Sequence, residues 1–507
     1  MSKIIEMQGI MKHFQYVQAV DDGQFDLNKG EIHSLIGENG AGKSTMMKML
    51  YGLYERDAGT IIVDGKQMPA HYNTFDAIDL GIGMVHQEFM LAKELTVLEN
   101  IIVGNEPRKN KIMVDKKAAV ERINEYIEKY HLNVQLNKKV ASISVGEAQR
   151  VEIIKALYRG ANILILDEPT AVLTPQECSK LFEILEVMKQ DGKSIIFISH
   201  KLKEVMQVSD RISVMRAGKY IGTVNKVDTS APELAKMMVG REVFCDIHHK
   251  SAIRDEVVLK VENLVVPAER ELSKLKGVSF EVHGGEILGI AGVDGNGQSE
   301  LADALVGFTK ADGGKITICG TDVTNRRPGE VRAAGLTHIP EDRNKHGLNK
   351  ALDIKNNLAA VEIDRAPYSK HGIIDRAAIV TEAKRRIEKF DIRPANGDAM
   401  VKSLSGGNAQ KVIVARELDM GGKILLANQP TRGVDIGAIE SIRNLISSAT
   451  DSGAAVLLIS ADLDEILSLA DRIIVLYEGR VNGEIMNDGN VDEMQLGLMM
   501  LGGKVNG

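Results

Sequence analysis

The same ordered set of short motifs occurs twice in this chain, and that repeat constrains the fold more than any other feature of the sequence. A glycine-rich segment that begins at Gly37 recurs at Gly292, 255 residues later, and a Ser-x-Gly-x-x-Gln segment at Ser144 recurs at Ser405, 261 residues later. Two further motifs repeat at displacements of 261 and 262 residues. Motifs that recur in one order at a nearly constant displacement indicate tandem copies of one domain with small loop insertions.

The boundary between the copies is marked by a change of pattern. At 507 residues the chain is too long for a single hydrophobic core. The segment between the copies has no helical or strand period, and an alternating apolar run over Val257–Val266 begins the second copy. We therefore predict a first domain over residues 1–243, a linker over 244–256 and a second domain over 257–507.

Each copy alternates short apolar runs with helical patterns. Glu31–Ile36, Asn162–Leu166 and Ser194–Ser199 predict buried strands, and Lys43–Leu53 predicts a helix. Residues 88–150 read as mostly helical, inserted before the next core strand. The predicted fold class is α/β, with two tandem phosphate-loop domains, each built on a mainly parallel core sheet with a helical subdomain.

The first glycine-rich segment has the spacing of a phosphate-binding loop and lies between a predicted strand and a predicted helix. Its glycines let backbone N–H groups curl around phosphate oxygens, and the helix N-terminus adds positive potential. Lys43 would bridge the β- and γ-phosphates, and Ser44 would offer its hydroxyl to Mg²⁺. The predicted nucleotide-binding residues of this loop are Gly37, Glu38, Asn39, Gly40, Ala41, Gly42, Lys43, Ser44 and Thr45.

Four polar residues near predicted strand ends complete the candidate chemistry of the first copy. Asp167 ends an aliphatic strand and is predicted, with Ser44 and Gln87, to hold Mg²⁺. Glu168 follows it and can polarise an attacking water as a general base. Gln87 can also orient water, and His200 at the end of another strand can reach a γ-phosphate. We therefore assign catalytic roles to Glu168, His200 and Gln87.

This ordered set resembles the ATP-binding cassette family, and the resemblance covers nearly all of both halves. It implies ATP and Mg²⁺ as cofactors. It also implies two cassettes within one chain that pair head to tail, with each ATP between one cassette's phosphate loop and the other's signature. Phe14, in the run Lys12–Phe14, matches the aromatic residue that stacks on adenine in this family.

The second copy departs from the family pattern at almost every reacting position. The phosphate-loop lysine, the magnesium aspartate, the catalytic glutamate, the switch histidine and the loop glutamine are replaced by Gln298, Asn428, Gln429, Ala461 and Glu341. Losing one such group commonly costs orders of magnitude in rate, so we expect no hydrolysis from this copy. The residues that build the sheet persist, so this domain should still fold.

One motif is better preserved in the second copy, because the first copy has Val145 where the second has the first signature glycine. The resemblance implies that the second signature and an interface-crossing aspartate complete the first copy's site. Those predicted binding residues are Ser405, Gly406, Gly407, Gln410 and Asp435. We expect one competent composite ATP site per chain.

The fused chain with a degenerate second half is similar to the ATPases of bacterial importers for simple sugars and nucleosides. Such ATPases are peripheral, at the cytoplasmic face of the cell membrane. They dock on two transmembrane permease subunits that an extracytoplasmic solute-binding protein feeds, with the contact near Gln87 and over Glu88–Glu106. Gln429 and the ending Leu496–Met500 favour the nucleoside branch, linked to a basic membrane lipoprotein, over ribose or galactose.

Composition agrees with this reading and excludes other classes. The 63 basic and 70 acidic residues give a net charge of −7, so no nucleic-acid partner is expected. Cys178, Cys245 and Cys319 match no metal or disulfide pattern, which favours a reducing compartment. The sequence shows no membrane-spanning run and no secretion signal.

Two alternatives stay open at this point. Soluble tandem-cassette ATPases that act on ribosomes also carry two cassettes, but they normally keep both sites intact and have a long charged linker. A regulatory or scaffold protein that binds ATP without hydrolysing it is the other alternative. Intact Glu168 and His200 argue against it.

Overall fold

The chain forms two compact units, Met1–Val243 and Phe244–Gly507, which we call unit 1 and unit 2. The computed structural model describes residues 2–14, 17–87, 89–109, 113–171, 173–240, 253–268, 274–293 and 295–503. Most of the predicted linker 244–256, together with Cys245, lies outside these residues. None of the helices in the described ranges combines the length and the apolar composition needed to cross a membrane.

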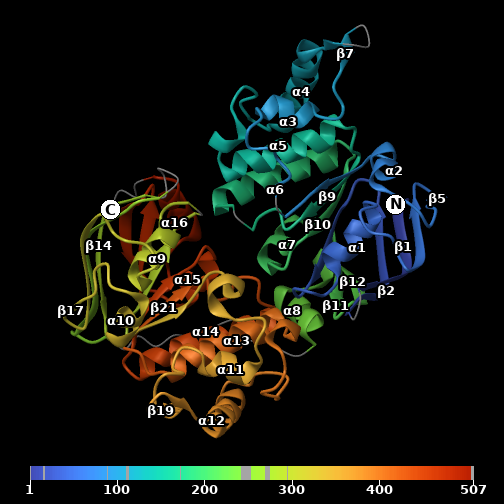
Figure 1. Ribbon diagram of the computed structural model, residues 1–507. Helices are drawn as coiled ribbons and strands as arrows, with labels where there is room; N and C mark the ends of the chain where they lie inside the picture. Colours follow the sequence, from blue (N-terminus) through green and yellow to red (C-terminus); the bar gives the residue numbers. More distant parts are fainter. Residues whose placement is uncertain are drawn as a thin grey trace. The chain divides into compact units, whose positions relative to one another are not determined.

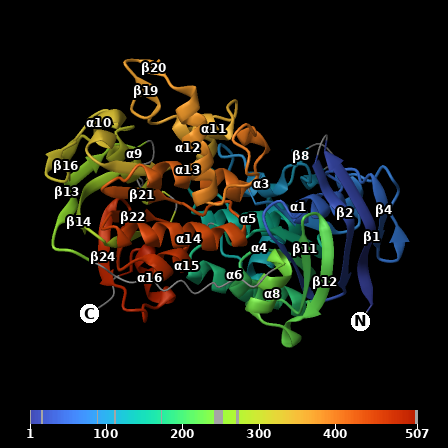
Figure 2. The same cartoon turned by 90° about the horizontal axis from the view of Figure 1, so that it is seen from below.

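Unit 1 contains two sheets. The central six-stranded sheet has the order β12-β11-β3-β10-β9-β6 and is parallel except for β12. Its strands are β3 (Ile32–Gly37), β6 (Ile82–Val85), β9 (Ile163–Asp167), β10 (Ser194–Ile198), β11 (Arg211–Arg216) and β12 (Lys219–Asn225). The second sheet is antiparallel, and three of its strands lie side by side in Figure 2. It consists of β1 (Lys3–Phe14), β2 (Val17–Asn28), β4 (Ala58–Val63) and β5 (Lys66–Gln67).

The helices of unit 1 divide into those beside the central sheet and a separate helical group. The helical group comprises α3 (Val97–Ile102), α4 (Lys116–Tyr130) and α5 (Val145–Tyr158), with a small hairpin of β7 (Arg108–Lys109) and β8 (Met113–Val114) beyond them (Figure 1). The other helices are α1 (Lys43–Leu50), α2 (Thr74–Asp79), α6 (Pro175–Gln190), α7 (Leu202–Val208) and α8 (Ala231–Val239).

Unit 2 repeats both sheets in the same strand order. Its central sheet runs β18-β21-β22-β15-β23-β24, parallel except for β24, and its antiparallel sheet runs β14-β13-β16-β17. The central strands are β15 (Ile287–Ala291), β18 (Leu336–Ile339), β21 (Ile424–Asn428), β22 (Ala455–Ile459), β23 (Arg472–Tyr477) and β24 (Arg480–Met486). The antiparallel strands are β13 (Val257–Val266), β14 (Leu275–His283), β16 (Gly313–Ile318) and β17 (Thr321–Asp322).

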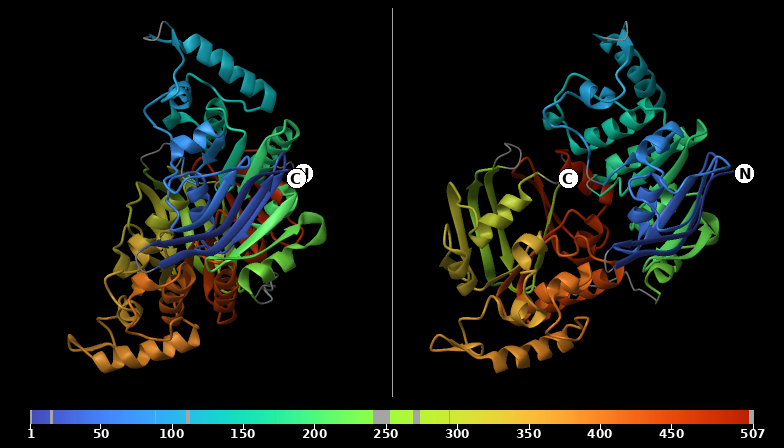
Figure 3. Two further views of the ribbon diagram at one scale, coloured as in Figure 1. Left: turned by 90° about the vertical axis from the view of Figure 1, so that its right-hand side faces the viewer. Right: turned by 45° about the vertical axis from the view of Figure 1, so that its right-hand side comes forward.

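The helices of unit 2 follow the same plan. Those of the helical group are α11 (Ile354–Ala359), α12 (Arg376–Lys389) and α13 (Gly406–Asp419). Figure 3 shows α12 at one end of the unit, next to the hairpin of β19 (Ser369–Lys370) and β20 (Ile373–Ile374). The remaining helices are α9 (Gln298–Val306), α10 (Pro328–Ala333), α14 (Ile436–Asp451), α15 (Leu463–Leu469) and α16 (Glu493–Met500).

The predicted α/β fold class is confirmed, and the predicted buried strands correspond to β3, β9 and β10. Every residue of these three strands is buried, which explains their continuous apolar runs. Two features exceed the prediction. Each unit carries an antiparallel sheet beside the parallel one, and the helical subdomain of each unit includes a two-stranded hairpin. The predicted helix Lys43–Leu53 ends earlier, at Leu50.

Candidate functional site

The phosphate loop of unit 1 joins the end of β3 to the start of α1. Gly42 precedes the helix in the left-handed conformation, with φ at 94°. A Cβ at this position would lie 2.4 Å from the carbonyl oxygen of Ala19, so a side chain is excluded both by conformation and by space. The loop therefore keeps its backbone N–H groups at the helix N-terminus, where they can bind an anion.

Lys43 is the first residue of α1, and its side chain folds back over the loop. Its Nζ donates to the carbonyl oxygens of Gly37 at 2.8 Å and Glu38 at 3.0 Å. Burial lowers the pKa of Lys43, while Glu168 and Asp167 oppose that change. A buried ammonium that is held only by carbonyl oxygens can exchange them for phosphate oxygens, which bind a cation more strongly.

Ser44 and Asp167 meet where β9 ends. The Ser44 hydroxyl donates to Asp167 Oδ1 at 3.0 Å. Burial raises the pKa of Asp167, and the hydrogen bond from Ser44 acts against that rise. A hydroxyl and a carboxylate side by side supply the hard oxygen ligands that Mg²⁺ prefers. Among the described residues, no group of three or more His, Cys, Asp or Glu side chains could hold a metal by itself.

Glu168 is the residue that joins the three predicted catalytic groups. Its Oε1 lies 3.0 Å from His200 Nδ1, and its Oε2 accepts from Gln87 Nε2 at 3.2 Å. Burial raises the pKa of Glu168, but His200 and Lys43 outweigh burial and the net pKa is below the ordinary value. Glu168 is therefore an ionised carboxylate that can accept a proton. Its backbone has a φ of 48°, which is uncommon outside glycine and costs energy.

The other predicted residues lie at the following places. Phe14 ends β1 and is 39% exposed, with its ring edge-to-face to Tyr54 at a centroid distance of 5.3 Å. In unit 2, Ser405 and Asp435 stand directly before α13 and α14 and accept hydrogen bonds from their first turns. A Cβ at Gly407 would lie 2.7 Å from Asp435 Oδ2, so the signature and the aspartate are in contact. Gln410 and Gly407 are both buried.

The structure thus brings Lys43, Ser44, Gln87, Asp167, Glu168 and His200 together in unit 1. It brings Gly406, Gly407 and Asp435 together with the turn after β21 in unit 2. That these two groups join in one ATP site stays a prediction.

The corresponding edge of unit 2 has the same backbone conformation after its central strand but lacks the carboxylates of unit 1. Gln429 has a φ of 50°, close to that of Glu168, although its carboxylate is gone. Its Oε1 accepts from the backbone N–H of Ala461 at 3.3 Å. Ser299, which corresponds to Ser44, donates to Glu341 Oε2 at 3.1 Å rather than to a strand-end aspartate.

Sequence reasoning missed Glu204 on α7. Its Oε2 accepts from the Thr170 hydroxyl at 2.5 Å and from the Ser199 hydroxyl at 3.2 Å. Glu204 thereby joins the segment after Glu168 to the segment before His200. A signal was present, because an acid recurs 261 residues later as Glu465 in the copy that has lost both strand-end acids, at Asn428 and Gln429.

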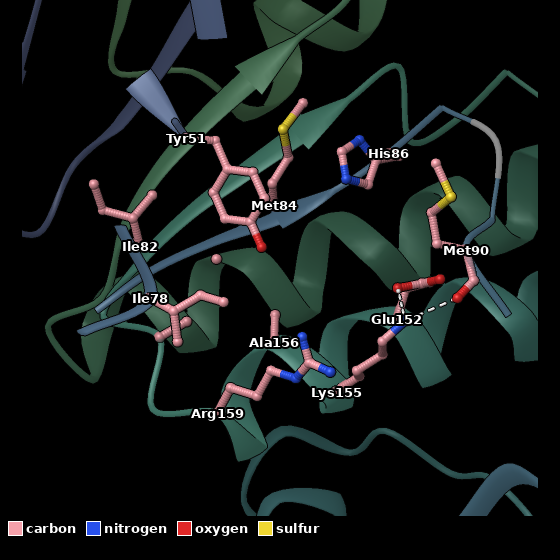
Figure 4. Close-up of a pocket in the computed structure, with 12 residues that line it drawn as sticks. Tyr51, Ile78, Ile82, Met84, His86, Met90, Glu152, Lys155, Ala156 and Arg159 are labelled. Atoms are coloured by element: carbon pink, nitrogen blue, oxygen red, sulfur yellow. Dashed lines mark hydrogen bonds and ion pairs between the residues drawn. The ribbon is translucent and has the colours of Figure 1, made fainter. Parts of the chain in front are cut away.

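A pocket of about 140 Å³ lies beside Gln87, between the central sheet and the helical group of unit 1. Figure 4 shows Tyr51 and His86 on one side, and Glu152 of α5 and Arg159, directly after α5, on the other. Glu152 Oε1 and Arg159 Nε are buried atoms with no hydrogen-bond partner among the residues that the structure describes, so the described pocket has an unused acceptor and an unused donor. Burial lowers the pKa of His86, which keeps this wall uncharged near neutral pH.

The corresponding place in unit 2 is filled. Ala156 corresponds to Glu417, whose carboxylate is fully buried. It accepts from Arg332 Nη1 at 2.6 Å, from Arg416 Nε at 2.9 Å and from the backbone N–H of His338 at 3.1 Å. Burial raises the pKa of Glu417, but Arg416 and Arg332 outweigh it and the net pKa is lowered.

Comparison with known proteins agrees with this geometry. Residues 20–171 and 275–432 each match the ABC transporter family, one match for each unit. This chain belongs to the ABC transporter family. It is an ATPase of that family, as the motifs indicated.

Full-length relatives narrow the branch of the ABC family. A nucleoside import ATP-binding protein of Lactococcus lactis is 46% identical over 99% of both chains. A guanosine import ATP-binding protein of Bacillus subtilis is 45% identical over 100% of both chains. A ribose import ATP-binding protein of Chromobacterium violaceum is 38% identical over 94% of both chains. The resemblance to fused sugar and nucleoside importer ATPases is confirmed.

Proposed function

We propose that this ABC ATPase energises the import of nucleosides. The observation that carries the proposal is the identity of 45–46% over the whole chain to two relatives named for nucleoside and guanosine import, against 38% for one named for ribose import. The partners of such a subunit would be two membrane permeases and an extracytoplasmic solute-binding protein. The chain would lie at the cytoplasmic face of the membrane, bound to the permeases.

We further propose that one composite ATP site works in each chain. Unit 1 retains every group that acts on phosphate, and unit 2 has lost them at Gln298, Asn428, Gln429 and Ala461. Unit 2 instead keeps the full signature, which begins at Ser405. The losses therefore fall on one kind of residue. Unit 2 has lost the groups that would act on its own ATP, and it has kept the signature that would complete the site of unit 1. Ser405, Gly406, Gly407, Gln410 and Asp435 would complete the site of unit 1.

We propose a role for each residue that unit 1 contributes to this site, and the contacts described above support these roles. Lys43 would leave its loop carbonyls for phosphate oxygens, and Phe14 would stack on the adenine. Mg²⁺, held by Ser44, Asp167 and Gln87, would neutralise phosphate charge. Glu168 accepts the proton of the attacking water, because its lowered pKa keeps it ionised at neutral pH.

His200 and Gln87 restrain the Glu168 carboxylate from two sides. Each contact is a single hydrogen bond to a loop residue, so the carboxylate can be held or released when either loop moves.

We propose the pocket of Figure 4 as part of a permease contact. It lies beside the Glu88–Glu106 segment, and the unpaired atoms of Glu152 and Arg159 can be satisfied by polar atoms of a partner helix. Ala156→Trp fills this pocket and should abolish uptake while leaving hydrolysis by the free chain unchanged. Ala118→Trp, on the exposed face of α4, is the matched control. Normal uptake with Ala156→Trp would place the contact elsewhere.

The substrate proposal is tested by uptake in a strain that lacks this chain. Wild type should restore uptake of radiolabelled guanosine, and Lys43→Ala should not. Uptake of labelled ribose should be the same in all strains. Restoration of ribose uptake alone would overturn the nucleoside proposal. Sedimentation with ribosomes rather than with membranes would favour the soluble tandem-cassette alternative.

A further inference from the structure

Hydrogen bonds and an ion pair join two segments of unit 2 that are distant in sequence. The first follows β18 and the second follows β21. Arg343 in the first segment donates from Nη1 to the carbonyl oxygen of Arg432 at 2.9 Å and from Nη2 to that of Gly433 at 3.0 Å. One planar guanidinium thus binds two consecutive carbonyls of the turn, and these charge-assisted bonds fix its orientation.

Glu341 adds a second connection between the same segments. Its Oε1 forms an ion pair with Arg432, and its Oε2 accepts from the Ser299 hydroxyl at 3.1 Å. Ser299 lies in the first turn of α9, directly after the degenerate phosphate loop. Glu341 therefore ties the loop after β18 both to α9 and to the turn after β21. We call Glu341, Arg343 and Arg432 the latch.

The latch lies against the signature. A Cβ at Gly406 would be 2.8 Å from the carbonyl oxygen of Gly433 and 3.0 Å from Arg343 Nη2. The turn then leads to Asp435, whose Oδ2 is close to the neighbouring signature glycine, Gly407. The latch thus holds the turn that carries Asp435 and packs directly on the backbone of the signature.

Among the residues of unit 1 that the structure describes, no such set of ion pairs joins the two equivalent segments. The strand registers align Val85 with Leu166 in unit 1 and Ile339 with Ala427 in unit 2, which makes Glu341 the counterpart of Gln87. The counterparts of Arg343 and Arg432 are then Phe89 and Ala171, which carry no charge.

The two loops also differ in what they bind. Gln87 makes one neutral-donor bond of 3.2 Å, to the catalytic carboxylate, whereas the loop of unit 2 makes ion pairs and charge-assisted bonds to a turn. At these equivalent positions, the contact of Gln87 is to the catalytic carboxylate, whereas the contacts of Glu341 and Arg343 fix their loop to the turn after β21.

We propose that the latch positions the signature and Asp435 of unit 2 for the ATP bound by unit 1, so that the degenerate edge acts as a rigid support. Its three members are positioning residues, because none of them touches the reacting atoms. This inference rests on the proposed composite site. It explains why the acid Glu341 stands where the family pattern has the loop glutamine, and why arginines stand at the counterparts of Phe89 and Ala171.

The test uses the full chain with Arg343→Met, which keeps an unbranched stem of four atoms and removes the guanidinium donors. We expect kcat for ATP hydrolysis to fall about tenfold, since small misplacements of a positioned group are costly. The KM for ATP should stay within about twofold, because Lys43 and the loop of unit 1 still bind the nucleotide. Arg343→Lys should recover part of the rate, because it restores one donor. Arg326→Met, an exposed residue of unit 2, is the matched control.

Hydrogen exchange gives a readout that does not depend on hydrolysis. In Arg343→Met the backbone amides of Arg432 and Val434 should exchange faster than in wild type, with the thermal transition unchanged. Unchanged exchange would overturn the latch as a support of this turn. If Glu341→Gln and Arg343→Met both leave kcat unchanged while Asp435→Ala lowers it, the latch inference fails and the composite site stands. If Asp435→Ala also leaves kcat unchanged, the composite site itself is wrong.

Discussion

Unit 1 and unit 2 share the backbone at the phosphate-loop edge of their sheets and differ in the side chains that this backbone presents. Both central sheets have the same strand order, and the residues after β9 and β21 have φ values of 48° and 50°. In unit 1 that strained residue is Glu168, the proposed general base. In unit 2 it is Gln429, whose side chain accepts a hydrogen bond from the backbone amide of Ala461. Unit 2 thus keeps the strained backbone although it has lost the carboxylate at this position. We infer that the backbone of this edge serves a purpose other than hydrolysis in unit 2.

The largest effect is expected from the phosphate loops. Lys43→Ala should lower hydrolysis about a thousandfold, because it removes the buried cation that we propose binds the phosphates. Gln298→Lys in unit 2 should change hydrolysis less than twofold, since restoring one cation does not restore the lost carboxylates. Phosphate release by the purified full chain measures both. If Lys43→Ala hydrolysed ATP near the wild-type rate, the proposal that only the site of unit 1 is active would be wrong.

The parts of this comparison that sequence could predict are those coded by local pattern. The run Val257–Val266 alternates and forms β13 over the same residues. The fully apolar runs form buried parallel strands, and the glycine spacing places a loop before α1. These features depend on neighbours in sequence, so the pattern is sufficient.

What sequence did not predict depends on contacts between distant segments. Glu204 lies 34 residues from Thr170, and Arg343 lies 89 and 90 residues from the two carbonyls that it binds. The filled site at Glu417 depends on Arg332, 85 residues away. The antiparallel sheets were also missed, because their pairing joins strands across the phosphate-loop segment.

The next largest effect is expected from substitutions that exchange one signature residue between the two units. Gly406→Val gives unit 2 the residue that unit 1 has at Val145. Its Cβ would lie 2.8 Å from the carbonyl oxygen of Gly433, so the turn must move and hydrolysis should fall about tenfold. Val145→Gly should leave the rate unchanged, because in the proposed composite arrangement the signature of unit 1 would complete only the site of unit 2, which lacks the reacting groups. A larger loss in Val145→Gly than in Gly406→Val would reverse the assignment of the working signature.

Low pH should destabilise unit 2 more than unit 1, because unit 2 contains the buried His338. Burial lowers the pKa of His338 to about 4, and its counterpart in β6 of unit 1 is Met84. Between the ordinary pKa of 6.5 and about 4, the unfolded chain binds a proton that the native chain does not. Stability from this group is therefore complete above pH 6.5 and is lost as the pH falls towards 4, by up to about 3 kcal/mol.

His338→Met should remove this part of the pH dependence. Calorimetry of the full chain at pH 7 and pH 5 measures it as the difference between wild type and variant. His71→Gln, an exposed histidine of unit 1, is the control. Equal pH dependence of wild type and His338→Met would show that His338 is protonated in the native state.

The smallest effect is expected at Gln429, and that result is as informative as the largest. If unit 2 hydrolysed ATP, the residue at the position of Glu168 would matter, and Gln429→Ala would lower the rate of the chain. We expect a change within about twofold, because the side chain only accepts from the Ala461 amide and carries no ionisable group. Gln429→Glu should not raise the rate either, since Asn428 and Gln298 still lack the metal-binding carboxylate and the phosphate-binding cation. A gain of hydrolysis in Gln429→Glu, measured with Lys43→Ala in the same chain, would show that unit 2 binds and activates ATP without those groups. No gain would mean that this edge of unit 2 has a structural role and not a catalytic one. The latch and the strained turn preserve the backbone on which that role depends.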